Sequence, residues 1–376
     1  MKKSKRCAET LWYEIINPEE VFSPGLLIYP ERIKSNILRM IKIAGSAERL
    51  RPHVKSHKMA EIIKLQIDLG INKFKTSTIS ETEMVARSGG KDILLAIQPV
   101  GPNIDRFFNL KKEFRDTRFS CIVDSEEIIN KLSGMATCTG METHVWLDIN
   151  SGMNRTGVAP GESASRLIQK IITIPMLKLE GLHVYDGHIK EKDFSLREKL
   201  YNDSFKPVME FVEKLKTAGI RDLNIVAGGT PTFPFHAMRQ DVDCSPGTTL
   251  LWDYGYSHSF TDMDFLHAAV LLTRIISKPS NGLICLDLGH KAVASEMPQP
   301  RIFIPAMTNY TIIGHSEEHM VIQTSKEEKL NVGDHIYCIP WHICPTVDRY
   351  DTVSVVRKMK VTEEWNVVAR KRNISL

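Results

Sequence analysis

Apolar and polar residues alternate in blocks between about residues 26 and 252, where short β-rich runs precede amphipathic stretches of helical length. A strand-like run at 26–29 and a helix-like stretch at 31–45 come first. Eight further strand-like runs follow, at residues 49–55, 73–78, 92–100, 118–124, 144–150, 177–189, 223–229 and 243–253. Strands that alternate with helices indicate βαβ units and a parallel sheet. We therefore predict an α/β fold, a closed (β/α)8 TIM barrel, over residues 24–252.

A doubly wound open sheet is the alternative to the barrel. The predicted range is close to the length of one barrel, which is typically about 250 residues. No GxGxxG follows the first predicted strand, so the dinucleotide-binding fingerprint of doubly wound folds is missing. Both observations favour the barrel.

Beyond Asp262 the pattern changes to strand-like runs separated by turn signals such as SNG and NVGD. The runs lie at residues 266–277, 282–289, 301–307, 311–325, 334–340 and 352–361. Such a series of short strands indicates a second, mostly β domain. We assign residues 253–376 to this domain, together with residues 1–23, which could add a strand.

Composition narrows the class of protein. The chain has 376 residues, 42% hydrophobic and 25% charged, as in soluble globular proteins. Its net charge of +4 is small, and only MKKSKR and ARKRN are locally basic, so nucleic-acid binding is not expected. No apolar run has the length of a membrane span or the form of a signal peptide. The seven cysteines are widely spaced, which predicts a cytoplasmic protein with free thiols.

Lys55 ends the first predicted barrel strand, in the string RLRPHVKSHK, with His53 and His57 on either side. Catalytic residues of barrels lie at the C-terminal ends of the strands. A lysine whose amine is held near neutrality can form a Schiff base with a carbonyl compound. A solvated surface lysine would show the same local pattern, so the assignment depends on other segments.

Two segments after later strands contain residues suited to binding a ring. Arg155 lies in NSGMNR after the fifth strand, and its planar fork could donate to an anionic ring oxygen. Tyr185 and His188 lie in YDGH after the sixth strand, where the tyrosine could line a ring. Each could instead be a surface ion pair or a core aromatic residue.

The seventh strand is followed by Gly228, Gly229 and Thr230 in the string AGGTPT. Two glycines and a hydroxyl residue let backbone N–H groups converge on an anion, and barrels often bind phosphate after strands seven and eight. An ordinary glycine turn explains the pattern equally well. A lysine together with a phosphate loop suggests pyridoxal 5'-phosphate as the cofactor.

His342 and Cys344 occur two positions apart in WHICPTV. On an extended strand such side chains point to the same face, so an imidazole and a thiolate could bind one metal. Two protein ligands leave positions open for water and substrate, as in catalytic metal sites. These ligands favour zinc, with manganese or magnesium as alternatives.

The strings RPHVKSHK, NSGMNRTGV, VAGGTPT and PWHICPTV occur in this order between about Pro24 and Asp351. With them the chain resembles the D-threonine aldolase and D-serine dehydratase group of fold-type III pyridoxal-phosphate enzymes. More distantly, the barrel is similar to that of alanine racemase. The resemblance implies a barrel that binds the cofactor, a β domain that supplies metal ligands, and a homodimer.

The resemblance also implies roles for individual residues. Lys55 matches the Schiff-base lysine, and Arg155 matches the arginine near the phenolic oxygen of the cofactor. Tyr185 matches an active-site tyrosine, and His188 lies near a histidine proposed as the base in aldolases. Gly229 and Thr230 match phosphate-binding backbone. His342 and Cys344 match the pair of metal ligands.

The implied activity is that of a metal-dependent lyase acting on D-β-hydroxy amino acids. Retro-aldol cleavage of a D-threonine-type substrate to glycine and an aldehyde is favoured by the segment SPGTTLLWD. A D-serine dehydratase, which releases a keto acid and ammonia, is the main alternative and is favoured by Cys344. An amino-acid racemase would need a second base, and a non-catalytic pyridoxal-phosphate-binding protein would lack the β domain.

Overall fold

The structure is a computed structural model of the chain, and it describes residues 11–325 and 330–374. The fold divides into two compact units. The β unit contains the described part of Met1–Arg32, together with Asp253–Gly255 and His267–Trp365. The barrel unit contains Ile33–Trp252, Tyr256–Leu266 and the described part of Asn366–Leu376.

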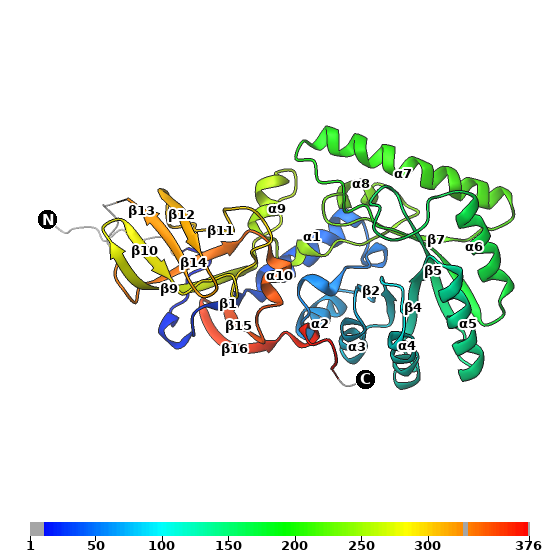
Figure 1. Cartoon of the computed structure of the whole chain (residues 1–376), viewed down its shortest axis with the longest axis horizontal. Coiled ribbons are helices and arrows are strands. Elements are labelled where there is room, and N and C mark those ends of the chain that lie inside the picture. Colours follow the sequence, from blue (N-terminus) through cyan, green and yellow to red (C-terminus); the bar gives the residue numbers. More distant parts are fainter. Residues whose placement is uncertain (1–10, 326–329, 375–376) are drawn as a thin grey trace. The chain divides into compact units, whose positions relative to one another are not determined.

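The barrel unit is built on a seven-stranded parallel sheet with the strands in sequence order (Figure 1). The strands are β2 (Lys73–Thr76), β3 (Asp92–Leu95), β4 (Arg118–Val123), β5 (Thr143–Ile149), β6 (Leu177–Val184), β7 (Asn224–Ala227) and β8 (Asp243–Cys244). The helices are α2 (Ala60–Asp68), α3 (Ile79–Arg87), α4 (Pro102–Glu113), α5 (Glu126–Thr139), α6 (Glu162–Thr173), α7 (Phe194–Thr217), α8 (Phe233–Ala237) and most of α9 (Tyr254–Ser259). Helix α1 (Pro30–Ala44) begins in the β unit and continues into the barrel unit.

The two faces of each strand explain how the sheet is buried. Leu147 of β5 packs in one apolar cluster with residues of α6 and α7, such as Ile168 and Phe211. Side chains alternate along a strand, so Trp146 faces the other way, where it clusters with one residue each from β3, β4 and β7. Helices therefore cover the outer face, while the inner face fills the barrel.

The first predicted barrel strand, residues 49–55, is not a regular strand, and this part of the prediction is wrong. Leu50 forms a bridge with Cys244 of β8, and His53 forms a bridge with Lys75 of β2. The amide of Lys75 also donates to the carbonyl of Pro52. The segment thus lies between the last and first strands, but Pro52 has no N–H to extend the ladder. The predicted α/β barrel with a separate, mostly β domain is otherwise confirmed.

The β unit contains a nine-stranded sheet. Its main path runs β12-β13-β10-β9-β1-β15-β16, and β14 pairs with β9 and β11. The strands are β1 (Gly25–Ile28), β9 (Ala269–Ser280), β10 (Leu283–Leu286), β11 (Ile302–Phe303), β12 (Tyr310–His315), β13 (Met320–Thr324), β14 (His335–Pro340), β15 (Thr352–Arg357) and β16 (Lys360–Asn366), and the helix α10 spans Ile343–Val347.

The assignment of residues 26–29 to the barrel is also wrong, because strand β1 belongs to the sheet of the β unit. Its apolar run falls within the range 24–252 that the block pattern predicts for the barrel, yet it pairs with β9 and β15 of the β unit. Its last three residues are buried, so hydrophobicity alone could not distinguish a barrel strand from a central strand of the other sheet. Within residues 11–23 the structure contains no strand, and the N-terminal part of the chain contributes β1 instead.

Candidate functional site

Lys55 lies in a short 3₁₀ turn, Val54–Ser56, and not at a strand end. The imidazole of His53 accepts a hydrogen bond from the backbone N–H of Lys55 at 3.4 Å, and that of His57 accepts from Met59 at 3.2 Å. Both imidazoles therefore bond to the backbone near Lys55. They fix the turn that carries Lys55.

The two cations predicted from the sequence, Lys55 and Arg155, both lie next to the ring of Tyr185. Tyr185 follows β6, and the Nζ atom of Lys55 lies 5.4 Å from its ring centroid. The guanidinium carbon of Arg155, which follows β5, lies 5.1 Å from the same centroid. Residues 130 positions apart in the chain are thereby gathered at one end of the barrel strands, as the strand assignment predicts.

A third cation, Lys75 of β2, was not identified from the sequence. Its Nζ atom also lies 5.4 Å from the Tyr185 centroid, and the residue is only 1% exposed. Burial above all, and then the nearby Lys55, lower the pKa of Lys75 to about 7, although Asp186 and Asp148 act in the opposite direction. The string KFKTST shows only an ordinary strand, so no local signal marks this lysine.

Two carboxylate–histidine pairs lie in the same part of the barrel. Asp148 Oδ1 is 2.7 Å from His183 Nδ1, and Asp186 Oδ2 is 2.7 Å from His236 Nε2. Thr232 donates a further hydrogen bond to Asp186 at 2.8 Å. Burial alone would raise the pKa of each carboxyl group, but the histidine partners hold both below their usual value. Both pairs are thus buried, and the lowered pKa of each carboxyl group favours its ionised form.

The loop after β7 has the backbone conformation that its glycines permit. Gly228 has a φ of +83°, and a Cβ atom there would lie 2.4 Å from the ring of His236. Thr230 Oγ1 accepts from the amides of Gly247 and Thr248 at 3.3 and 3.2 Å, so the loops after β7 and β8 meet. Gly229 N–H donates to a hydroxyl at a similar 3.3 Å.

These long hydrogen bonds join backbone N–H groups to neutral hydroxyl oxygens. A phosphate oxygen is a stronger acceptor than a hydroxyl, so this group of amides fits a phosphate. Gly247 and Thr248 were not among the phosphate residues predicted from the sequence. Their signal is the run of small residues in SPGTT directly after the last barrel strand.

His188 is exposed and lies next to the loop that carries Arg155. A Cβ atom on Gly152 would approach His188 Nε2 to 3.1 Å, which shows that the imidazole covers this glycine. The imidazole is accessible to solvent and close to the β5 loop. It is thus available to a substrate, unlike the buried histidines 183 and 236.

His342 and Cys344 lie at the start of α10, not on an extended strand as predicted. The side chains are nevertheless close, since burial lowers the pKa of His342 but Cys344, Asp253 and Glu296 together raise it to about 9. Glu296 forms a hydrogen bond with His342 Nδ1. A metal-bound histidine typically donates its other N–H to such a carboxylate. An imidazole beside a thiol, with this partner, fits a metal.

Asp253 holds the turn between the two predicted ligands. The residue is 2% exposed, and its Oδ2 accepts from the amide of Ile343 at 3.0 Å. The sequence offered no role for Asp253, and the structure assigns it a positioning role. No group of three or more potential ligands is present in residues 11–325 and 330–374, so any metal here would keep open positions.

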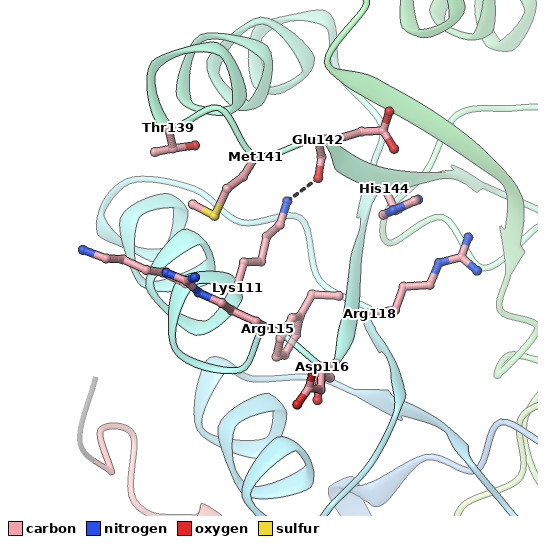
Figure 2. A pocket seen from close by; sticks show the side chains of 11 residues that line it. Lys111, Arg115, Asp116, Arg118, Thr139, Met141, Glu142 and His144 are labelled. Atoms are coloured by element: carbon pink, nitrogen blue, oxygen red, sulfur yellow. Dashed lines mark hydrogen bonds between the residues drawn. The ribbon is translucent and has the colours of Figure 1, made fainter.

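A cavity of about 830 Å³ opens at the opposite end of the barrel strands, where Arg118 begins β4 (Figure 2). Lys111 extends into it and donates to the carbonyl of Glu142 at 2.7 Å. The cavity lining contains none of the predicted site residues. Because barrel active sites lie at the C-terminal ends of the strands, we assign this cavity no part in catalysis.

The comparison with family models covers both units. Residues 28–255 match the model described as alanine racemase, N-terminal domain, and residues 268–356 match a putative serine dehydratase domain. The chain belongs to the alanine racemase-like, fold-type III family of pyridoxal-phosphate enzymes. Membership in this family makes pyridoxal phosphate the cofactor that the barrel residues would hold.

Full-length members of this family are similar to the chain. A 3-hydroxy-D-aspartate aldolase of Paracoccus denitrificans is 28% identical, with 94% of each chain covered. A crystal structure of a D-threonine aldolase from Filomicrobium marinum matches with a TM-score of 0.87 and 26% identity, over 95% of this chain and 98% of that one. A D-serine dehydratase of Dictyostelium discoideum is 24% identical, over 89% and 93%. The protein is thus an enzyme of a lyase group within this family.

Two further expectations concern the whole chain. Among the described residues, no helix is long and apolar enough to cross a membrane. Within the part of the chain that the structure describes, the cysteines form no disulfide; they are Cys121, Cys138, Cys244, Cys285, Cys338 and Cys344. Cys7 lies outside the described residues.

Proposed function

We propose that this protein is a pyridoxal-phosphate- and metal-dependent lyase that cleaves D-threonine-type substrates to glycine and an aldehyde by a retro-aldol reaction. The observation that carries the proposal is the position of Lys55 and Arg155 around the ring of Tyr185. Aldolases for D-threonine and 3-hydroxy-D-aspartate are among the relatives similar over nearly the whole chain. The shared substrate class is a D-β-hydroxy amino acid.

The barrel residues have separate tasks in this proposal. Lys55 holds the cofactor covalently, and Arg155 pairs with its phenolic oxygen. The ring of Tyr185 lines the pocket, while the backbone of Gly228, Gly229 and Thr230 binds the phosphate. Pyridoxal phosphate, when bound, supplies an electron sink for negative charge at the substrate Cα. The protein contributes position and charge.

Retro-aldol cleavage also needs a base for the proton of the β-hydroxyl group. His188 is our candidate, because its imidazole is exposed and adjacent to the β5 loop. Histidine is the side chain most often used for proton transfer near neutral pH. The electron pair of the broken O–H bond forms the carbonyl of the aldehyde, and the electron pair of the broken Cα–Cβ bond stays on Cα. A proton taken up at Cα then gives glycine.

The β unit would hold a divalent metal through His342 and Cys344. The metal would act as a Lewis acid that lowers the pKa of a hydroxyl group. Zinc suits an imidazole and a thiolate best, with manganese or magnesium as alternatives. We also propose that the enzyme is a cytoplasmic homodimer, on the resemblance to its family.

A D-serine dehydratase is the second candidate. The match of residues 268–356 to a putative serine dehydratase domain supports it, as does the relative of that activity. In a dehydratase Lys55 would remove the α-proton, and hydroxide would leave from the β-carbon. Water then hydrolyses the unsaturated amine that is left, which gives a keto acid and ammonia.

Product analysis separates these activities. The enzyme with pyridoxal phosphate and zinc or manganese is incubated with D-threonine, 3-hydroxy-D-aspartate and D-serine, with the L-enantiomers as matched controls. We expect glycine from the first two D-substrates, and loss of turnover after treatment with a chelator. A keto acid with ammonia would identify a dehydratase, and interconversion of enantiomers a racemase. No turnover under any condition would indicate a non-catalytic binding protein.

A further inference from the structure

Lys75 is a buried lysine whose amine contacts the ring of Tyr185 but has no hydrogen-bond or ion-pair partner among the described residues. Its side chain faces the barrel interior, because its register neighbour Leu94 belongs to the interior cluster. At 1% exposure it forms no side-chain hydrogen bond or ion pair with any residue in 11–325 or 330–374. Lysines are almost never fully buried unless paired, because burying a lone charge is costly. We therefore expect the Lys75 amine to pair with an anionic group of a bound molecule.

The carboxylates nearest to Lys75 are already engaged. Asp148 and Asp186 attract the amine electrostatically, but each forms its hydrogen bond with a histidine. Asp148 Oδ2 also has no hydrogen-bond partner of its own. The lysine and this free carboxylate oxygen are thus both buried without being joined to each other. An internal ion pair does not account for Lys75.

The residues around Tyr185 indicate that the partner of Lys75 carries a negative charge. The amines of Lys55 and Lys75 lie 5.4 Å from the ring centroid, and the guanidinium of Arg155 lies 5.1 Å from it. Three cations around one ring repel one another, as the effect of Lys55 on Lys75 shows. An anionic oxygen placed among them would offset this repulsion.

We propose that Lys75 is a cofactor-binding residue that pairs with an anionic oxygen of bound pyridoxal phosphate. This inference rests on the proposed function, since it assumes that the pocket around Tyr185 holds this cofactor. A partner in the pocket would favour the charged form of Lys75, which burial alone disfavours. The lysine thus costs stability in the free protein and contributes affinity in the complex.

Binding of pyridoxine 5'-phosphate tests the role of Lys75 without interference from Lys55. This analogue keeps the ring, the phenolic oxygen and the phosphate but has no aldehyde, so no covalent bond to Lys55 can form. Calorimetric titration compares the cofactor-free wild type with Lys75→Met, which keeps the length of the side chain and removes its charge. We expect at least tenfold weaker binding by the variant. Lys75→Gln serves as a second uncharged variant if the first does not fold.

Lys73→Met is the matched control, because Lys73 lies on the same strand but pairs with Asp243 at 2.6 Å. This variant should bind the analogue as the wild type does and unfold at a lower temperature. Lys75→Met should show the opposite pattern, with weaker binding and an unchanged or higher unfolding temperature of the cofactor-free protein. A purely structural lysine would not give this separation.

The two proposals fail in different ways. If the wild type binds neither pyridoxal phosphate nor the analogue, the proposed function is wrong. If the wild type binds both and the uncharged Lys75 variants bind equally well, the role of Lys75 is wrong. A lower unfolding temperature of the cofactor-free Lys75 variants would also contradict it, since that result indicates an internal partner such as Asp148.

Discussion

The side-chain amines of Lys55 and Lys75 lie at the same distance, 5.4 Å, from the ring centroid of Tyr185. Lys55 reaches the ring from a 3₁₀ turn, and Lys75 reaches it from strand β2. The backbone joins the two segments, since the amide of Lys75 donates to Pro52 at 2.9 Å. A small movement of either segment would therefore shift the positions of both amines.

The ring of Tyr185 has little room to move. A Cβ atom on Gly187 would lie 2.5 Å from three atoms of the phenol group. We predict that Gly187→Ala displaces the ring and lowers kcat/KM at least tenfold, with little change in unfolding temperature. Gly134→Ala is the control, since nothing lies within 4 Å of its added methyl group. Steady-state kinetics of both variants check this, and full activity of Gly187→Ala would show that the ring position is unimportant.

Replacement of His342 by alanine should remove metal and activity together. Zinc or manganese content is measured on the purified enzyme, and turnover is measured with D-threonine. The cofactor absorbance should persist, because Lys55 belongs to the barrel unit. His319→Ala, at an exposed position of the β unit, is the control. Metal-dependent turnover that survives in His342→Ala would remove this histidine from the metal site.

His57 should make the folded protein less stable in acid. Burial lowers its pKa to about 3, so between pH 6.5 and 3 the unfolded chain binds a proton that the folded protein does not. Stability therefore falls as the pH decreases through this range, by up to about 1.4 kcal/mol per pH unit. In His57→Asn, the loss of unfolding free energy between pH 7.5 and 5.0 should be smaller than in the wild type by about 2 kcal/mol.

Urea denaturation of the wild type and His57→Asn at both pH values provides this measurement. Asparagine keeps an acceptor for the amide of Met59, which bonds to His57 in the wild type. His319→Asn is the matched control, because this residue is exposed, and its pH dependence should equal that of the wild type. An identical pH dependence in His57→Asn would contradict the burial argument.

Lys55→Ala should abolish the absorbance band of the lysine-linked cofactor and all turnover. Lys64→Ala, an exposed position on helix α2, should leave both unchanged. Absorbance spectra of the reconstituted proteins distinguish the two results. A band of full strength in Lys55→Ala would show that another lysine forms the linkage.

The sequence predicts the barrel well because its strands are buried apolar runs that alternate with amphipathic helices. The predicted cations meet at Tyr185 for the same reason, since parallel strands place the residues that follow them at one edge. The segment at 49–55 misleads because Pro52 and the cap formed by His53 replace a strand with a turn. Such local hydrogen bonds compete with regular structure and are not visible in a hydrophobic pattern.

The role of Lys75 could not be predicted from the sequence. It is inferred from a buried amine that forms no hydrogen bond or ion pair among the described residues, which only the folded structure shows. A lysine in a short strand is ordinary until the register places it inside the barrel. Likewise, the pairing of Asp253 with the turn at Ile343 joins residues 90 positions apart. Long-range contacts of this kind follow from the fold and carry no local signal.

Reductive trapping of the cofactor tests the central claim most directly. The enzyme reconstituted with pyridoxal phosphate is treated with sodium borohydride and digested, and the peptides are analysed by mass spectrometry. We expect the pyridoxyl group on Lys55 and an unmodified Lys75. A pyridoxyl group on Lys75 or on any other lysine, with Lys55 unmodified, would contradict this account of the site.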